Sequence, residues 1–377
     1  MADLTLAFDP SSSLSKGIYT LKEFKQEWLV MEAEVIDVTR TALKEYESQK
    51  LSKEELPLTS AWVEYGSEIT AVGILARRFH ATEAWRELKY ERAVPKVLAM
   101  VGAIATLKRL PSKFSLNLGI LLPYIEYKDG RRFHKLIEKA LKNFKFRGES
   151  YQVSLEKFHC APEGAGILMR GLPEPKSKTE NAESALVLVL GLRDFSYLLM
   201  RQGQIKDADT EKLGLIRLLE IIKQSTSGLS LPELIEPVSL MMQTGDINCL
   251  NPLLKSSSLS GRRSELNTLT KGITNAKKQH WGMLHNWMTT RKFPSVLQVS
   301  ITGGTSRSYQ KEFINYFPEE PINWCERIES AVSQLLSPQL WEKKYKYRFT
   351  DVYCYFYYVM YHFAERPLSL VGKDQNG

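Results

Sequence analysis

The sequence has few of the residues that build metal centres or disulfide frameworks. Its 377 residues include four cysteines and six histidines. The histidines form no metal-binding pair, and the cysteines lie far apart without ligand spacing, at Cys160, Cys249, Cys325 and Cys354. This pattern argues against structural zinc and favours free thiols in a reducing, cytoplasmic environment.

Long apolar runs are also missing. A membrane-spanning helix needs about 20 predominantly apolar residues. The most apolar stretch, residues 185–200, carries Arg193 and Asp194 in its middle. An acid at position 3, without a basic region before an apolar one, argues against a signal peptide. We therefore expect no direct membrane contact.

The charge is not concentrated in one place. The 51 basic and 43 acidic residues give a net charge of +8, which favours acidic partners or nucleotides. Basic clusters occur at residues 142–147, 262–263 and 343–348. Clusters of this size are more typical of solvated helix faces and loops than of a DNA-binding surface. The charge alone therefore does not indicate nucleic-acid binding.

The segment from Asp9 to Lys16 is rich in hydroxyl groups and lies between two strand-like runs, residues 4–8 and 17–21. In a tight hairpin, its backbone N–H groups and serine hydroxyls could surround phosphate oxygens. The lysine could bind the terminal phosphates, and the aspartate could hold a hydrated Mg²⁺ ion. A flexible, serine-rich N-terminus is the alternative interpretation.

The patterns that follow predict an α/β protein whose length is sufficient for two domains. Alternating and periodic apolar residues predict strands within 24–37, 61–73, 116–125, 150–155 and 158–161, and helices over 91–110 and 133–144. The polar stretch 172–182 is the predicted linker. Beyond it, a strand–turn–strand pattern restarts around Gly191, which indicates an internal duplication.

The rest of the second half is predicted to be mostly helical, with helices at 213–224, 232–243, 264–289, 328–336 and 351–363. A buried strand over 294–301 leads into Gly303, Gly304, Thr305 and Ser306. Glycine there allows a ligand to approach the backbone closely, and a following helix would present N–H groups. A left-handed turn without a ligand is the alternative for this loop taken alone.

The order of these three loops resembles the actin/hsp70/sugar-kinase superfamily and, within it, the bacterial plasmid-segregation actins of the ParM/StbA group. The resemblance covers essentially the whole chain, although insertions match poorly. It implies an actin-like fold of two related domains, each a mixed β-sheet flanked by helices (ribonuclease H-like), with a nucleotide cleft between them. Domain I would comprise residues 1–171, with 340–377 packing back on it, and domain II residues 172–339.

The resemblance also implies a site for ATP or GTP with Mg²⁺. Asp9 would order the metal through water, and Lys16 would bind near the β-phosphate. Glu163 occupies the position of the glutamate that positions the attacking water, with an ordinary exposed turn acid as the alternative. The other implied nucleotide contacts are Ser11, Ser12, Ser13, Gly191, Gly303, Gly304 and Ser306.

The second phosphate hairpin departs from the superfamily pattern, which usually has Asp-x-Gly. Here Val189 stands where that aspartate is expected, although Gly191 is kept and can still offer its N–H. Asp194 could partly compensate, or Arg193 could face the phosphates. The missing carboxylate weakens the case for fast hydrolysis more than the case for binding, because phosphoryl transfer depends on placing Mg²⁺ and water.

The implied function is a filament-forming, nucleotide-dependent protein that slowly hydrolyses ATP. Its partners would be other copies of itself and a DNA-binding adaptor on a plasmid centromere, through which it segregates or positions plasmid DNA. The alternative is a non-polymerising nucleotide-binding regulator of the same fold with weak or no hydrolysis. A sugar or acetate kinase is disfavoured, because no acidic base on a recognisable substrate motif stands out.

Overall fold

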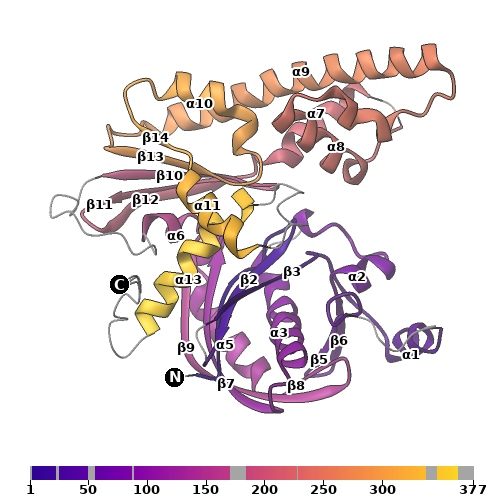
Figure 1. Cartoon of the computed structure of the whole chain (residues 1–377), viewed down its shortest axis with the longest axis vertical. Coiled ribbons are helices and arrows are strands. Elements are labelled where there is room, and N and C mark those ends of the chain that lie inside the picture. The colour runs from indigo at the N-terminus through magenta and orange to yellow at the C-terminus, as the bar shows by residue number, and fades with distance from the viewer. Residues whose placement is uncertain are drawn as a thin grey trace, which may run out of the picture. The chain divides into compact units, whose positions relative to one another are not determined.

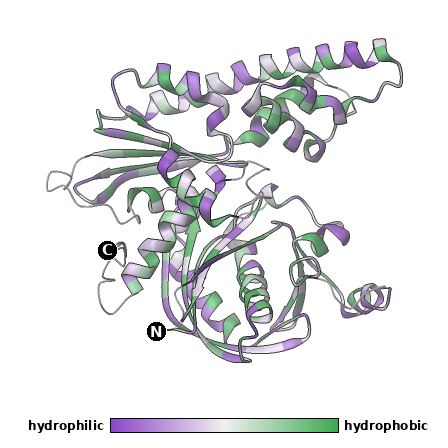
Figure 2. Cartoon of the chain, in the orientation of Figure 1, coloured by the Kyte–Doolittle hydropathy of each residue, from purple (hydrophilic) through white to green (hydrophobic). Residues whose placement is uncertain are grey.

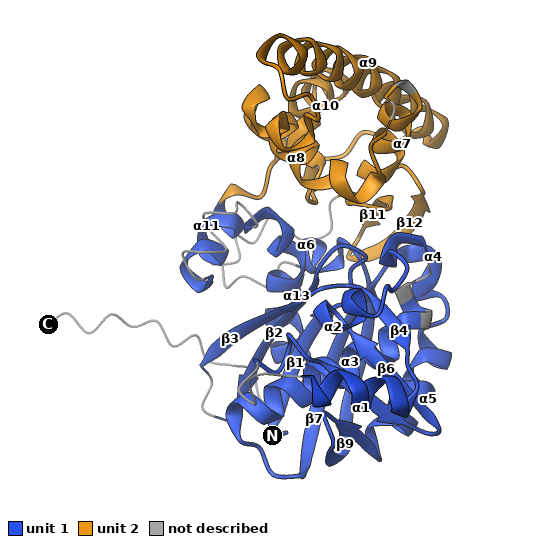
Figure 3. Ribbon diagram, turned by 90° about the vertical axis from the view of Figure 1, so that its right-hand side faces the viewer, with its two compact units in different colours: residues 1–176, 327–377 blue, residues 177–326 orange. Residues whose placement is uncertain are grey.

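The computed structural model describes residues 2–22, 25–49, 56–86, 89–169, 184–226, 228–336 and 346–363. The chain forms two compact units (Figures 1 and 3). Unit 1 contains residues 1–176 and 327–377, and unit 2 contains residues 177–326. The predicted linker over 172–182 lies outside the described residues. The return to unit 1 falls at residue 327, whereas we expected it at 340, so nearly all of helix α11 (Glu326–Leu335) belongs to unit 1.

Unit 1 is built on a nine-stranded mixed sheet with the order β3-β2-β1-β7-β9-β8-β5-β6-β4. At its centre, β1 is antiparallel to β2 and parallel to β7, and β7 is parallel to β9. The strands are β1 (Leu4–Asp9), β2 (Ser15–Leu21), β3 (Gln26–Met31), β4 (Val35–Asp37), β5 (Trp62–Tyr65), β6 (Glu68–Val72), β7 (Lys113–Leu122), β8 (Phe144–Phe146) and β9 (Glu149–Pro162).

Helices cover both faces of the central strands of unit 1. Side chains of α3 and α5 pack with alternate residues of β7, including Leu118 and Ile120, in one core. Gly119 points to the other face, where an added Cβ would lie 2.4 Å from the side chain of Val359 on α13. The helices are α1 (Arg40–Ser48), α2 (Ile74–Arg78), α3 (Lys89–Lys108), α4 (Tyr124–Tyr127), α5 (Gly130–Leu141), α6 (Ala165–Leu168), α11 and α13 (Thr350–Phe363), with 3₁₀ turns η1 (Ala84–Arg86) and η4 (Lys346–Arg348).

Unit 2 repeats the central pattern on a smaller scale. Its five-stranded sheet has the order β12-β11-β10-β13-β14, with β10 antiparallel to β11 and parallel to β13. Its elements are β10 (Ala185–Leu190), β11 (Phe195–Arg201), β12 (Gln204–Glu211), α7 (Leu215–Ser225), α8 (Leu231–Thr244), η2 (Ile247–Leu253), α9 (Leu259–Arg291), β13 (Gln298–Thr302), η3 (Ser306–Tyr309), α10 (Gln310–Tyr316) and β14 (Ile322–Asn323). Two mixed sheets flanked by helices confirm the predicted α/β architecture.

Some elements differ from the expectation, each for a physical reason. A single strand, β9, replaces the two short strands predicted over 150–161. Its pairing with β7 shifts register between Leu116 and Asn117, where β9 has one extra residue. Helix α5 ends at Leu141, so Phe144 belongs to β8. Strand β12 was not predicted, because its sequence is mainly polar (Figure 2). Its residues are largely exposed, and backbone pairing with β11 holds the strand. None of the described helices is long and apolar enough to cross a membrane.

Candidate functional site

Three parallel strands of unit 1 end at the same edge of its sheet. Strand β1 ends at Asp9, and its neighbour β7 ends at Leu122, which pairs with Pro162 at the end of β9. Because the strands run in the same direction, Asp9 and Glu163 both lie at this edge. Ligands of open α/β sheets bind outside the carboxyl ends of the strands. The fold thus brings together two residues that are separated by most of unit 1 in sequence.

Asp9 and Lys16 face each other across the first hairpin. They are a register pair of β1 and β2, and Lys16 Nζ lies 2.6 Å from Asp9 Oδ2. Both residues are buried. A buried ion pair fixes the base of the loop formed by residues 10–14, because separating the charges would leave each one uncompensated in a poorly solvated place.

The serines of this loop fall into two groups. Ser11 Oγ lies 3.5 Å from Ser13 Oγ, which accepts a hydrogen bond from Arg348 Nη2. Ser12 is only 3% exposed, and its buried hydroxyl has no hydrogen-bond partner within the described residues. The hydroxyl of Ser15, the first residue of β2, is also buried without a described partner, but it points to the opposite face of the strand from its neighbour Lys16. A buried hydroxyl without a partner costs about 1–3 kcal/mol. Such groups call for an unseen acceptor or water, and phosphate oxygens supply acceptors of this kind.

A buried lysine behind the loop was not predicted. Lys96 lies on α3 and is only 1% exposed, and its Nζ is 3.4 Å from the carbonyl oxygen of Pro10 and 3.5 Å from that of Ser11. Its cation is therefore directed at the backbone of the loop. A sequence signal did exist, since Lys96 interrupts an otherwise apolar stretch of the helix, residues 93–101.

The turn that follows β9 is held from two sides. The Glu163 N–H donates to the carbonyl oxygen of Leu122, 2.8 Å away. Asp351, in the first turn of α13, accepts hydrogen bonds from the N–H groups of Gly164 at 2.6 Å and Gly166 at 2.9 Å. Burial raises the pKa of Asp351 to about 7, and the negative charges of Asp9 and Glu163 also raise it. Asp351 was not among the predicted site residues, although it is the one acid within the aromatic stretch 349–363.

In unit 2, the late glycine loop lies against the second hairpin. Gly303 has a φ of +102°, and an added Cβ would be 2.3 Å from the carbonyl oxygen of Leu190, so glycine is required there. The Thr305 N–H donates to that same oxygen at 3.1 Å, and Thr305 Oγ1 donates to the carbonyl oxygen of Gly191 at 3.0 Å. Two of the three predicted loops are thus in direct contact.

Two more hydrogen bonds hold this loop within unit 2. The buried hydroxyl of Ser306 donates to the carbonyl oxygen of Gly303 at 2.8 Å, and so stabilises the loop itself. The Gly304 carbonyl oxygen accepts from Gln243 Nε2 on α8 at 3.1 Å. Gln243 was not predicted from the sequence, because no motif near it indicates a role in a site.

The second hairpin turn is closed by its own residues. The Gly191 N–H donates to the carbonyl oxygen of Asp194 at 2.9 Å. Arg193 Nε lies 2.7 Å from Asp194 Oδ2, and both side chains are buried. Asp194, considered as a partial substitute for the second metal-side carboxylate, is therefore ion-paired with Arg193, which was considered as a residue facing the phosphates. Val189 lies opposite Ser196 and Thr302 on the neighbouring strands.

A buried histidine connects helix α9 to the segment behind this hairpin. His280 Nε2 donates to the carbonyl oxygen of Leu213 at 3.0 Å, and its Nδ1 accepts from the hydroxyl of Tyr309. Burial lowers the pKa of His280 to about 4, so the ring is neutral at physiological pH. Gly214, which follows Leu213, donates its N–H to the carbonyl oxygen of Arg193 in the second hairpin, 3.0 Å away.

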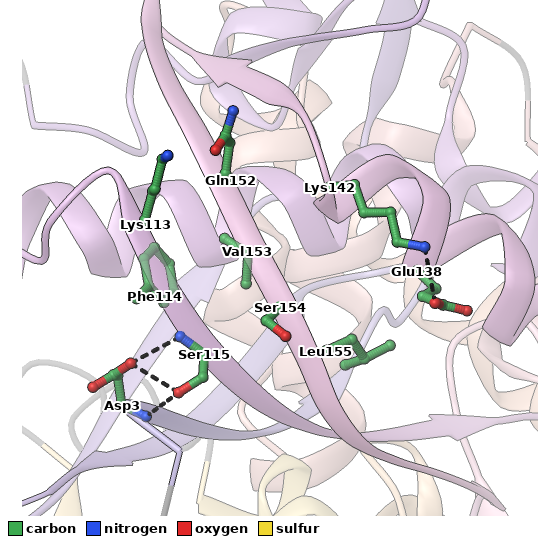
Figure 4. A pocket seen from close by; sticks show the side chains of 10 residues that line it. All are labelled: Asp3, Lys113, Phe114, Ser115, Glu138, Lys142, Gln152, Val153, Ser154 and Leu155. Carbon is green, nitrogen blue, oxygen red and sulfur yellow. Dashed lines mark hydrogen bonds and ion pairs between the residues drawn. The ribbon is translucent and has the colours of Figure 1, made fainter.

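A separate hollow of about 480 Å³ lies at the other end of β1 (Figure 4). Asp3 accepts hydrogen bonds there from the N–H and hydroxyl groups of Ser115, each at 2.8 Å. Its hydrogen bonds with Lys22 and Ser115 lower the pKa of Asp3 to about 2. None of the predicted site residues lines this hollow, whose position differs from the carboxyl edge that carries Asp9.

No protein-family model and no curated protein sequence matches the chain. Solved structures match it over nearly its whole length. The actin-like protein Alp7A gives a TM-score of 0.60 at 13% identity, covering 94% of this chain and 95% of its own. The ParM of a 15-stranded filament from Clostridium botulinum gives 0.60 at 16% identity, covering 96% and 99%. The chain has the actin-like fold.

A third neighbour, Bacillus thuringiensis ParM with ADP, gives a TM-score of 0.55 at 12% identity and covers 95% of this chain and 99% of its own. The resemblance to bacterial actin-like proteins that the three loops indicated is thereby confirmed at the level of the fold. In this actin-like chain, the first two described strands of each unit form a β-hairpin, and the first of them is parallel to a later strand. The predicted phosphate loops lie at these two hairpins.

Proposed function

We propose that this actin-like chain is a filament-forming protein that binds ATP or GTP with Mg²⁺ and segregates or positions plasmid DNA through a DNA-bound adaptor. The observation that carries the nucleotide proposal is the loop of residues 9–16. It combines a buried Asp9–Lys16 pair with the buried hydroxyl of Ser12, which has no partner among the described residues. Loops of this composition at the carboxyl edge of a sheet suit phosphate oxygens.

The donor set fits a magnesium nucleotide. Mg²⁺ is usually held by one or two carboxylates, water and substrate phosphates, and Asp9 supplies a carboxylate at the carboxyl edge of the sheet. By the resemblance, Lys16 and the hydroxyls of Ser11, Ser12 and Ser13 would bind the phosphates. Gly303 and Gly304, with Ser306 stabilising their loop, would contact the adenosine. A bound Mg²⁺ ion would neutralise charge on the phosphates during transfer.

Hydrolysis is assigned to Glu163, which would orient the attacking water and accept its proton. Its position after β9, at the same carboxyl edge as Asp9 and two strands away from it, supports this role. With Val189 in place of a second carboxylate, and with Arg193 and Asp194 paired to each other, we expect turnover to be slow. That ion pair also favours a second candidate function, a non-polymerising nucleotide-binding regulator of the same fold.

Self-association is proposed from the fold. Several structural neighbours were solved as filaments, among them Alp12 and the Clostridium botulinum ParM. By this analogy we propose a homopolymer in the cytoplasm, linked to DNA by an adaptor protein. Sedimentation and electron microscopy with nucleotide measure polymerisation directly.

The test combines nucleotide calorimetry, sedimentation and electron microscopy of the full chain with ATP–Mg²⁺ and GTP–Mg²⁺. We expect binding and pelletable filaments from the wild type, and neither from Asp9→Ala. Asp3→Ala is the matched control, because Asp3 is an acid flanking the other end of β1 and binds Ser115 outside the loop. Unchanged nucleotide binding by Asp9→Ala would remove the assignment of the site. Tight binding without filaments or phosphate release would favour the regulator.

A further inference from the structure

We propose that Asp351 is a positioning residue that holds the turn carrying Glu163 in place for nucleotide hydrolysis, a role that rests on the proposed function. Asp351 belongs to α13, near the end of the chain. It accepts a hydrogen bond from the N–H of Gly164, which lies 187 residues earlier in the sequence. It would act through the backbone of the turn and would touch neither the nucleotide nor the attacking water.

The turn cannot support itself. Helix α6, which follows Glu163, has only four residues, Ala165–Leu168. The first N–H groups of any helix lack partners within the helix, and a helix of one turn is not stable alone. Asp351 supplies the missing acceptors from another part of the chain, with one carboxylate oxygen for Gly164 and the other for Gly166.

The turn also has the backbone that this close approach requires. Gly164 has a φ of +90°, a conformation that favours glycine. An added Cβ on Gly166 would lie 2.2 Å from the carbonyl oxygen of Asp351 and 2.8 Å from its Oδ1. Gly164 thus allows the backbone conformation of the turn, and Gly166 allows α13 to contact the turn directly. Together with the bond from the Glu163 N–H to Leu122, these contacts fix the backbone on both sides of Glu163.

The arrangement carries an electrostatic cost that packing alone does not explain. Asp351 is buried, and the negative charges of Asp9 on β1 and Glu163 in the turn act on its carboxyl group, while Lys16 is the cation paired with Asp9. An uncharged acceptor on α13 would hold a turn amide without bringing a third carboxylate into this group. We infer that Asp351 is placed for accurate positioning of Glu163.

The experiment compares the full-length wild type with Asp351→Asn, in which one oxygen remains and an N–H₂ group opposes the second amide. Phosphate release at saturating ATP–Mg²⁺ and the Kd for the nucleotide are measured for both. We expect kcat to fall at least about tenfold, since small displacements of catalytic groups have effects of this size or larger, while Kd stays within about twofold. Tyr357→Phe is the matched control, because it removes a hydrogen bond between α13 and Gln26 that is remote from the turn.

Hydrogen exchange of the wild type provides a second readout that does not depend on a folded variant. The Gly164 and Gly166 amides should be protected in the wild type and should exchange faster in Asp351→Asn. Three results would each overturn the positioning role: Gly164 and Gly166 amides that are unprotected in the wild type, an unchanged kcat in the variant, or a nucleotide affinity that falls by the same factor as kcat. A wild type that binds nucleotide but releases no phosphate would overturn both the hydrolysis and this role, whereas an Asp351→Asn variant with the wild-type kcat would overturn this role alone.

Discussion

Asp9 on β1 and Lys16 on β2 form a buried ion pair that closes the first hairpin of unit 1, with Lys16 Nζ 2.6 Å from Asp9 Oδ2. The corresponding hairpin of unit 2 also contains a buried pair, but there the partners are the adjacent residues Arg193 and Asp194. The first pair ties β1 to β2, while the second is confined to one turn. The two hairpins thus have the same strand pattern but different charge arrangements at the position proposed to meet phosphate.

Substitution of Lys16 tests the structural role of this pair. Lys16→Met should lower the free energy of unfolding by about 3–5 kcal/mol, because it leaves the buried Asp9 carboxylate without its cation. Urea unfolding at neutral pH measures the loss. The double variant Asp9→Asn with Lys16→Met should recover part of it, since no buried charge then remains. Losses that simply add in the double variant would contradict the coupling.

Substitution of Gly303 tests the contact between the two loops of unit 2. Gly303→Ala should lower the free energy of unfolding by more than about 3 kcal/mol, because positive φ strain is joined by a clash with the Leu190 carbonyl oxygen. Gly203→Ala is the matched control: its φ is +70°, but no atom lies within 4 Å of the added Cβ, so a loss of about 1 kcal/mol is expected. Equal losses in thermal or urea unfolding would contradict the close approach.

The buried carboxyl of Asp351 should make stability depend on pH. Its pKa is raised from 3.8 to about 7 in the folded protein, so the folded state binds more protons than the unfolded state between these values. The contribution of this group to the free energy of unfolding should therefore fall as the pH rises from about 4 to 7, by up to roughly 4 kcal/mol. His280, whose pKa is lowered to about 4, acts in the opposite direction below pH 6.5.

The difference between wild type and Asp351→Asn isolates the effect of Asp351. Urea unfolding at several pH values should show the variant losing stability relative to wild type at pH 5 and recovering some of that difference by pH 8. A difference that does not change with pH would show that the carboxyl does not titrate in this range.

Restoring the second carboxylate tests why turnover is expected to be slow. Val189→Asp should raise phosphate release several-fold in the presence of Mg²⁺, because it adds an oxygen ligand at the position where the superfamily has one. Val189→Asn is the control, since it has a similar shape and polarity without the charge. Equal rates in the two variants would indicate that the missing carboxylate does not limit hydrolysis.

The parts of the fold that follow local patterns were predictable, and the parts that depend on distant contacts were not. The strands on either side of Asp9–Lys16 show as alternating apolar runs, and the Gly303 loop follows a recognisable strand. Lys96, Asp351 and Gln243 gain their roles only through contacts with segments 85, 187 and 61 residues away. Strand β12 is defined by backbone pairing, which side-chain patterns do not record.

The bond from His280 to the Leu213 carbonyl oxygen joins helix α9 (Leu259–Arg291) to the segment beside the second hairpin. Leu269, Ile273 and Ala276 of the same helix are also buried, so α9 is held along much of its length. The second hairpin is therefore backed by a helix that is itself anchored, and a change at His280 would be felt at the hairpin before it reached the exposed end at Leu259.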